Sequence, residues 1–127
     1  MEDLSAGKLK VKNSIFFGHL YHISKKEEMD LIINHHKNLY KKANHHCYAV
    51  IFANNNQVDK YYKNDGEVGR PGQLLLELLI KYKMNNSMLC VSRIFGGIKL
   101  GVGGVSRSFK KVGESVIQYY ISKNISK

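Results

Sequence analysis

The chain has 127 residues, enough for one domain with a substantial buried core, and its apolar fraction of 43% argues against a disordered chain. No apolar run approaches the roughly 20 residues that cross a bilayer, and residues 1–10 lack the apolar stretch of a secretory signal, so we expect a cytoplasmic protein without a membrane segment. The formal charge of +10 favours an anionic partner such as RNA, DNA or a nucleotide, although a lysine-rich composition alone would give the same charge.

Seven elements are predicted, in the order β-α-β-β-α-β-α. They cover residues 15–23, 24–42, 45–52, 58–63, 73–83, 88–95 and 105–121. Alternating or continuous apolar residues indicate the strands, and apolar residues at the helical spacing indicate the helices. A capping-box pattern from Ser24 to Glu27 marks the start of the first helix, and Pro71 suits the first turn of the second.

This order predicts an α+β fold, a two-layer sandwich in which a sheet of about four strands carries its helices on one face. No repeat or linker interrupts the pattern, so we expect a single domain of residues 1–127 with a core from about 14 to 121. The strand at 88–95 is apolar almost throughout, which is typical of a central strand buried on both faces. Cys47 and Cys90 are expected to be reduced thiols rather than a disulfide.

The strongest candidate site is the glycine-rich segment 93–107. Five of the nine residues in 96–104 are glycine, which lets the backbone approach a ligand closely, although the same glycines would also let helix and sheet pack closely. The segment leads into a helix N-terminus, whose unpaired amides attract anions. The three arginines of the chain all lie in the wider glycine-rich stretch from Gly66 to Gly113, and guanidinium groups suit carboxylate or phosphate. We expect an anion-binding site formed by Arg70, Arg93, Gly96, Gly97, Lys99, Gly101, Gly103, Gly104 and Arg107.

A second loop, at 65–72, is expected to face this site through Asp65, Gly66, Glu67 and Gly72. Its two carboxylates could hold Mg²⁺ together with a substrate phosphate, and they could equally cap the next helix or pair with an arginine. The chain has neither the Gly-Lys-Ser/Thr ending of a phosphate-binding loop nor the third glycine of a dinucleotide fingerprint. No cofactor and no metal site is predicted, because the histidine pairs at 35–36 and 45–46 lack the spacing of a zinc site.

The segment from Arg93 to Arg107 resembles the hallmark segment of the IMPACT/YigZ family. Three further segments, at 17–20, 44–49 and 65–72, resemble family motifs in the same order and spacing, so the resemblance covers about 14–116. The pair Gly103-Gly104 is similar to the prokaryotic branch. The chain departs from the family pattern at three positions, where an aspartate and two prolines are replaced by Asn64, Val68 and Leu74.

The resemblance implies a fold like that of the second domain of ribosomal protein S-five, and a role in the regulation of translation. Eukaryotic members restrain activation of a starvation-response kinase that phosphorylates an initiation factor, and prokaryotic members have been suggested to bind nucleic acid. The resemblance of residues 44–49 to a family motif makes His45, Cys47 and Tyr48 secondary candidates for the site. We therefore expect a regulatory protein, more plausibly a binding protein than an enzyme, whose partner is RNA, another anionic ligand or a translation-related protein.

Two other functions stay open from the residues alone. One is a metal-dependent enzyme that acts on a phosphorylated small molecule, with Asp65 and Glu67 as the metal ligands. The other is a protein-interaction module whose basic surface meets an acidic partner.

Overall fold

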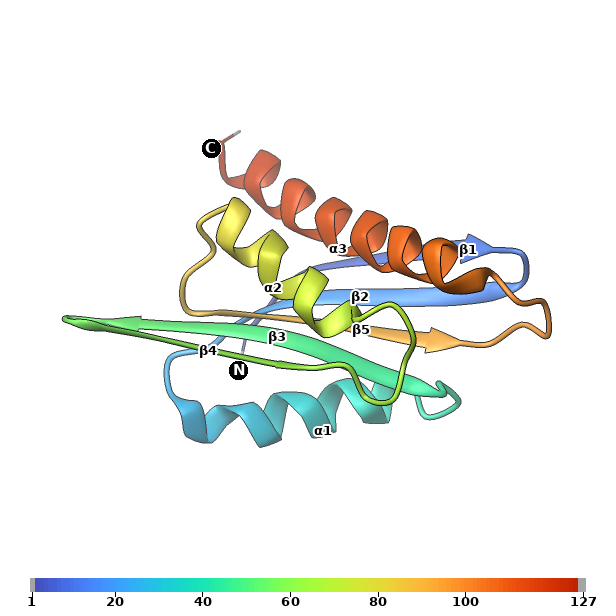
Figure 1. The fold of residues 1–127 in the computed structure, drawn as a ribbon. Coiled ribbons are helices and arrows are strands. Elements are labelled where there is room, and N and C mark those ends of the chain that lie inside the picture. The colour runs from blue at the N-terminus through green and yellow to red at the C-terminus, as the bar shows by residue number, and fades with distance from the viewer. Residues whose placement is uncertain (1, 126–127) are drawn as a thin grey trace.

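The computed structural model describes residues 2–125 and shows a single five-stranded sheet with helices on both of its faces (Figure 1). The strands run in the spatial order β1-β2-β5-β3-β4, and all neighbours are antiparallel. The elements in chain order are β1 (Glu2–Val11), β2 (Ser14–His22), a short 3-10 helix (Lys26–Glu28), α1 (Met29–Leu39), β3 (His45–Asn54), β4 (Gln57–Lys63), α2 (Pro71–Lys81), β5 (Ser87–Ile94) and α3 (Gly101–Ile125).

The α+β class is confirmed, but the helices do not share one face. The long helix α3 and the shorter α2 cover one side of the sheet, and α1 covers the other (Figure 1). The larger core lies under α2 and α3 and includes Phe16, Leu89 and Phe109, while a smaller core under α1 is centred on Ile32 and Met88. The physical reason lies in β5, whose residues are buried from Ser87 to Arg93, so that both of its faces need cover.

The sheet has one strand more than the sequence predicted. The additional strand, β1, pairs with β2 along almost its whole length, and only two residues, Lys12 and Asn13, join the two strands. Both of these residues have positive φ angles, 45° and 67°, as in the tight turns that match the twist of a hairpin. β1 was missed because it is poor in β-branched and aromatic residues, and only the alternation from Lys8 to Val11 indicates a strand.

Two helix starts also differ from the prediction. At α1, the capping carboxylate is Glu28 rather than Glu27, because its Oε1 accepts the backbone N–H groups of Ser24 and Lys25, each at 2.8 Å. The helix ends at Leu39, three residues before the predicted end. At α3, the helix begins at Gly101, four residues before the predicted start. Three of the predicted loop glycines therefore belong to the first turn of a helix.

The helix α3 packs closely on the sheet because small residues line the contact. A Cβ atom at Gly7 of β1 would lie 2.9 Å from a methyl group of Val116, and one at Gly18 of β2 would lie 3.2 Å from the same methyl. Ser5 adds a hydrogen bond of 2.9 Å from its hydroxyl to the carbonyl of Val116. This contact fixes α3 at Val116, just past its midpoint, beside the hairpin of β1 and β2.

Candidate functional site

The centre of the predicted site is a buried ion pair between Arg93 on β5 and Glu67 in the 65–72 loop. Arg93 Nε donates to Glu67 Oε2 at 2.7 Å and Arg93 Nη2 donates to Oε1 at 2.9 Å, so the guanidinium holds the carboxylate with two parallel bonds. Both side chains are buried, at 9% and 1% exposure. Arg93, which the sequence predicts as an anion ligand, therefore already has its anion within the chain.

The other polar groups of the 65–72 loop also bind the protein itself. Asp65 Oδ2 accepts the backbone N–H of His46 at 2.7 Å, and the carbonyl of Asp65 lies 2.9 Å from His45 Nδ1. Asn64, which stands where the family has an aspartate, accepts the N–H of Gly72 at 2.8 Å. A Cβ at Gly72 would lie 2.6 Å from the carbonyl oxygen of Lys63, so this glycine serves close packing. These contacts fasten the loop to the start of β3.

The loop between β5 and α3, residues 95–100, is held at its beginning. The N–H of Phe95 donates to Asn44 Oδ1 at 2.8 Å, and that of Gly96 donates to Ser14 Oγ at 3.3 Å. A Cβ at Gly96 would overlap the backbone of Asn13, so only glycine lets this loop pass against the β1–β2 turn. The amide of Gly96, one of those expected to face a ligand, is thus already satisfied.

Further along, the loop opens toward solvent. Gly97 and Gly101 have φ angles of 87° and 74°, with nothing within 4 Å of an added Cβ, so glycine is needed there for the backbone conformation alone. The first four amides of α3, which begin at Gly101, have no partner inside the helix and form its positive end. This is the part of the predicted glycine segment that keeps the expected geometry.

The surface beside these glycines is apolar. Four large side chains are exposed there: Val68 at 48%, Phe95 at 42%, Ile98 at 45% and Val102 at 59%. We call these four residues the apolar patch. Val68, Phe95 and Val102 line a hollow of about 280 Å³ together with Leu100, Lys99 and the buried Arg93.

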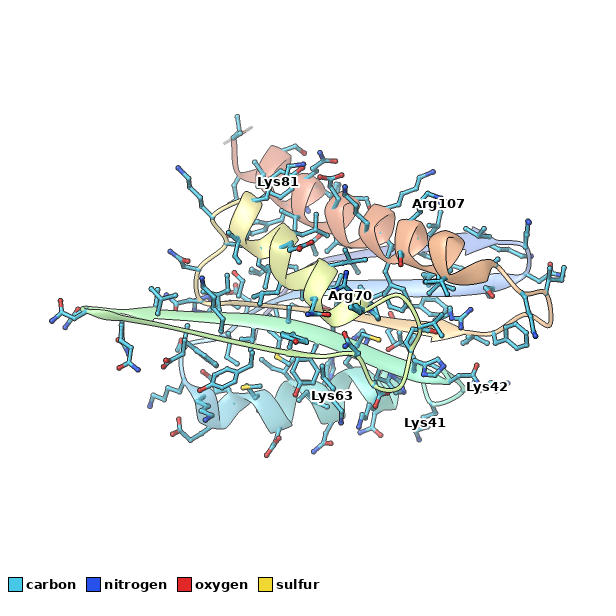
Figure 2. All side chains as sticks on the ribbon, in the orientation of Figure 1. Lys41, Lys42, Lys63, Arg70, Lys81 and Arg107 are labelled. Atoms are coloured by element: carbon cyan, nitrogen blue, oxygen red, sulfur yellow. The ribbon has the colours of Figure 1, made fainter. Side chains whose placement is uncertain are left out.

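The remaining predicted cations do not converge on one point. Lys99, Arg70 and Arg107 are all exposed, and Figure 2 shows Arg70 by the start of α2 and Arg107 on α3. Lys99 lines the hollow of the apolar patch, whereas Arg107 lines a different hollow, on the side of α3 that faces β1. The guanidinium of Arg107 folds back over Gly103, with Nη1 3.0 Å from the place that a Cβ there would take.

The secondary candidates have structural contacts. Cys47 is buried and donates from Sγ to the carbonyl of Asn64 at 3.2 Å, and burial raises the pKa of its thiol, which disfavours the reactive thiolate. His45 lies on the same face, with Nε2 3.9 Å from Glu67 Oε1. Tyr48 points to the opposite face, where it packs against the smaller core under α1.

A second cluster of titratable groups lies under α1. His36 is 1% exposed, with Nδ1 3.2 Å from the Tyr21 hydroxyl, and its Nε2 has no hydrogen-bond partner among residues 2–125. Burial lowers the pKa of His36 to about 3, and the nearby His19 and His46 add to this effect. His19 is hydrogen-bonded to both Asp3 and Tyr40, and His46 Nδ1 lies 2.6 Å from Ser92 Oγ.

No three His, Cys, Asp or Glu side chains in the described part of the chain are arranged to hold a metal ion. The two carboxylates considered as metal ligands have other partners, since Glu67 binds Arg93 and Asp65 binds the backbone of His46. None of the helices within residues 2–125 is long and apolar enough to cross a membrane.

Sequence reasoning missed the apolar patch because it considered the glycines and cations of the segment and not the side chains between them. Phe95, Ile98, Leu100 and Val102 follow neither the helical nor the strand period, so no pattern marks them as a group. The only available signal was their apolar character within a glycine-rich loop, where polar residues are usual.

The fold and this surface define a small α+β domain in which buried and half-buried polar groups hold two loops in place. The sequence matches the family model described as the Impact N-terminal domain over residues 12–117. The chain therefore belongs to the IMPACT family, as its glycine segment predicted.

Relatives and solved structures agree with this assignment. The chain is 35% identical over 102 residues to the IMPACT family member YvyE of Bacillus subtilis, covering 80% of this chain and 46% of the relative. It is 35% identical over 94 residues to the IMPACT homolog of Dictyostelium discoideum, covering 71% of this chain and 27% of that protein. The chain thus spans less than half the length of both relatives.

Two solved structures share the fold. A crystal structure of a hypothetical protein superimposes with a TM-score of 0.83 at 24% identity, over 90% of this chain and 56% of the other. The two-domain translational regulator Yih1 superimposes with a TM-score of 0.60 at 20% identity, over 93% of this chain and 46% of Yih1.

Proposed function

We propose that this domain is a non-catalytic regulator of translation that acts by binding a protein partner through the apolar patch and the cations around it. The proposal of a role in translation rests on membership of the IMPACT family and on the shared fold with Yih1, which is described as a translational regulator. The proposal of a protein partner rests on the surface of the chain itself.

The observation that carries the proposal is the exposure of four large apolar side chains, Val68, Phe95, Ile98 and Val102, beside the most family-specific segment of the chain. A contiguous apolar surface with a polar rim is typical of protein–protein contacts. Its floor carries little net charge, because Arg93 is neutralised by Glu67. Burying this surface against a partner therefore leaves no unpaired charge at the centre of the contact.

The rim gives the chemistry of the partner. Lys99, which lines the hollow, and Arg70, two residues after Val68 in the chain, are exposed, and no ion pair to either is found within residues 2–125. A segment that places an apolar side chain in the hollow and carboxylates beside it would match both the floor and the rim. The partner we propose is accordingly an acidic segment of a translation-related protein.

A cell-free translation extract tests the function. The purified domain should change the yield of a reporter protein in proportion to its concentration, and Val102→Asp should abolish this effect by placing a charge in the centre of the apolar patch. The matched control is Tyr119→Asp, which puts the same charge at a similarly exposed position, 53%, on the same helix. A reporter yield that does not respond to the wild-type domain, or that responds equally to both variants, contradicts the proposal.

Retention experiments test the kind of partner. After nuclease treatment of the extract, the immobilised wild-type domain and the Tyr119→Asp variant should retain the same translation component, and the Val102→Asp variant should lose it. A component whose retention disappears with the nuclease would show that the partner is RNA, and it would overturn the assignment of a protein partner.

A further inference from the structure

A separate hollow lies on the other side of the first turns of α3, against the β1–β2 hairpin. Its volume is about 330 Å³, in the range of small-ligand sites. The floor is formed by the apolar residues Leu9, Val11 and Leu100, and the rim by Lys12, Arg107 and Lys111. Its lining includes no carboxylate.

The three cations of this rim are unbalanced. No ion pair to any of them is found within residues 2–125. By contrast, Lys81 is paired with Glu114 at 2.9 Å, and Glu114 is the only acidic residue after Glu77 in the sequence. The hollow therefore brings together three positive charges that the described part of the chain does not neutralise.

The arrangement of these cations is unfavourable without a ligand. Arg107 and Lys111 are four residues apart on α3, so two like charges face each other on one side of the helix. Lys12 has a φ of 45° at a turn position that usually takes asparagine, aspartate or glycine. Each residue is a poor choice for stability, and together they surround one hollow.

Two glycines of the family segment bring the cations together. Gly96 lets the β5–α3 loop lie against the backbone of Asn13, which places the Lys12 turn beside the beginning of α3. Gly103 leaves room for the guanidinium of Arg107 to fold over the first turn of the helix. The glycines thus shape the hollow by packing, and side chains supply its charge.

We propose that this hollow binds a phosphate monoester, with the phosphate held by Lys12, Arg107 and Lys111 and the remainder of the ligand lying on Leu9, Val11 and Leu100. A terminal phosphate carries close to two negative charges at neutral pH and matches three cations around one hollow better than the single charge of an internal phosphodiester. The source of this group is a small phosphorylated molecule or the 5′-phosphorylated end of an RNA. The rim of this hollow shares no residue with the apolar patch, and the two hollows have only Leu100 in common.

Nuclear magnetic resonance of the 15N-labelled domain tests the site, with adenosine monophosphate as the probe and adenosine as its uncharged counterpart. We expect adenosine monophosphate, and not adenosine, to shift the backbone amides of Lys12, Gly103, Gly104 and Lys111. Lys111→Glu should weaken binding by about ten- to hundredfold, the range expected for losing a hydrogen bond between charged groups. The control is Lys60→Glu, which changes the net charge equally at an exposed position on β4 and should leave the affinity unchanged.

Short RNAs separate the two sources. If RNA ends are the ligand, a tetranucleotide with a 5′-phosphate should bind at least about tenfold more tightly than the same RNA with a 5′-hydroxyl, as expected from the loss of a charged contact. Equal binding of the two RNAs would exclude RNA ends as the source. Amide shifts spread over the surface, or equal weakening by Lys111→Glu and Lys60→Glu, would each overturn the proposal. The Val102→Asp variant should bind adenosine monophosphate as the wild type does. A domain that does not bind phosphate could therefore still bind a protein through the apolar patch, so the two proposals fail separately.

Discussion

Arg93 illustrates how a side chain that the sequence marks as a ligand for an external anion can have an internal structural role. The bias toward arginine in the glycine-rich segment was a sound signal that a planar, two-pronged donor is needed. What the sequence could not give was the partner, because Glu67 lies 26 residues away and its approach depends on how the 65–72 loop is fastened to β3. Arg70 and Arg107, which are exposed, are the two arginines that stay available to a partner.

Arg93→Ala is expected to lower the free energy of unfolding by about 3–5 kcal/mol, because it leaves the buried carboxylate of Glu67 without its counter-charge. A second substitution, Glu67→Ala, should recover part of this loss when it is added to Arg93→Ala, since it removes the uncompensated charge. Urea unfolding of the wild type, the two single variants and the double variant measures this coupling. Losses that simply add would mean that the two side chains do not stabilise the fold as a pair.

Among the helices and strands, those with a clear apolar period were predicted from the sequence, and those that depend on contacts between distant segments were missed. The strands at 15–23, 45–52 and 88–95 and all three helices are present, because their apolar patterns are strong. β1 was missed because it is stabilised by pairing with β2 and by the cover of α3 rather than by its composition. The start of α3 was placed too late because three glycines, poor helix formers, occupy its first turn.

Gly96 in the β5–α3 loop and Gly103 in the first turn of α3 should therefore respond differently to alanine. Gly96→Ala is expected to cost about 1–3 kcal/mol, because its Cβ would overlap the backbone of Asn13 and force the loop from the hairpin. Gly103→Ala should be neutral or stabilise by up to about 1 kcal/mol, since it lies in a helix and meets only the flexible end of Arg107. Thermal and urea unfolding compare the two variants, and a stable Gly96→Ala variant would contradict the packing role of that glycine.

Across the whole molecule, the predicted two-layer sandwich became three layers because α1 packs on the face opposite α2 and α3. The sequence showed that both faces of the sheet need cover, because β5 is apolar almost throughout. It did not show which helix covers which face, because the apolar stripes of all three helices look alike. The core under α1, unlike the core under α2 and α3, contains buried histidines. These histidines make the stability of the whole fold depend on pH.

The free energy of unfolding is expected to fall as the pH drops from about 6.5 toward 3. His36 is neutral in the folded protein, with its pKa lowered to about 3 by burial, whereas its pKa in the unfolded chain is about 6.5. The unfolded state therefore binds more protons in this window, and this group contributes a loss of at most about 1.4 kcal/mol per pH unit. The lowered pKa of His46, also caused by burial, acts in the same direction.

Urea unfolding at a series of pH values between 7 and 4 measures this dependence. His36→Leu should reduce the slope of stability against pH by the contribution of one proton, whatever its effect on stability at pH 7. An unchanged slope in this variant would show that His36 does not titrate on unfolding in that range.

The two-residue connection between β1 and β2 makes the fold sensitive to an insertion at this turn. Side chains alternate between the faces of a strand, so one residue inserted between Val11 and Ser14 would turn Leu9 and Val11 away from α3 or shift the pairing of the whole strand. The same insertion would carry Lys12 away from Arg107 and remove the surface against which Gly96 rests. An insertion in this turn, which belongs to none of the family motifs, would thus remove the proposed phosphate-binding hollow without changing the glycine-rich segment 93–107.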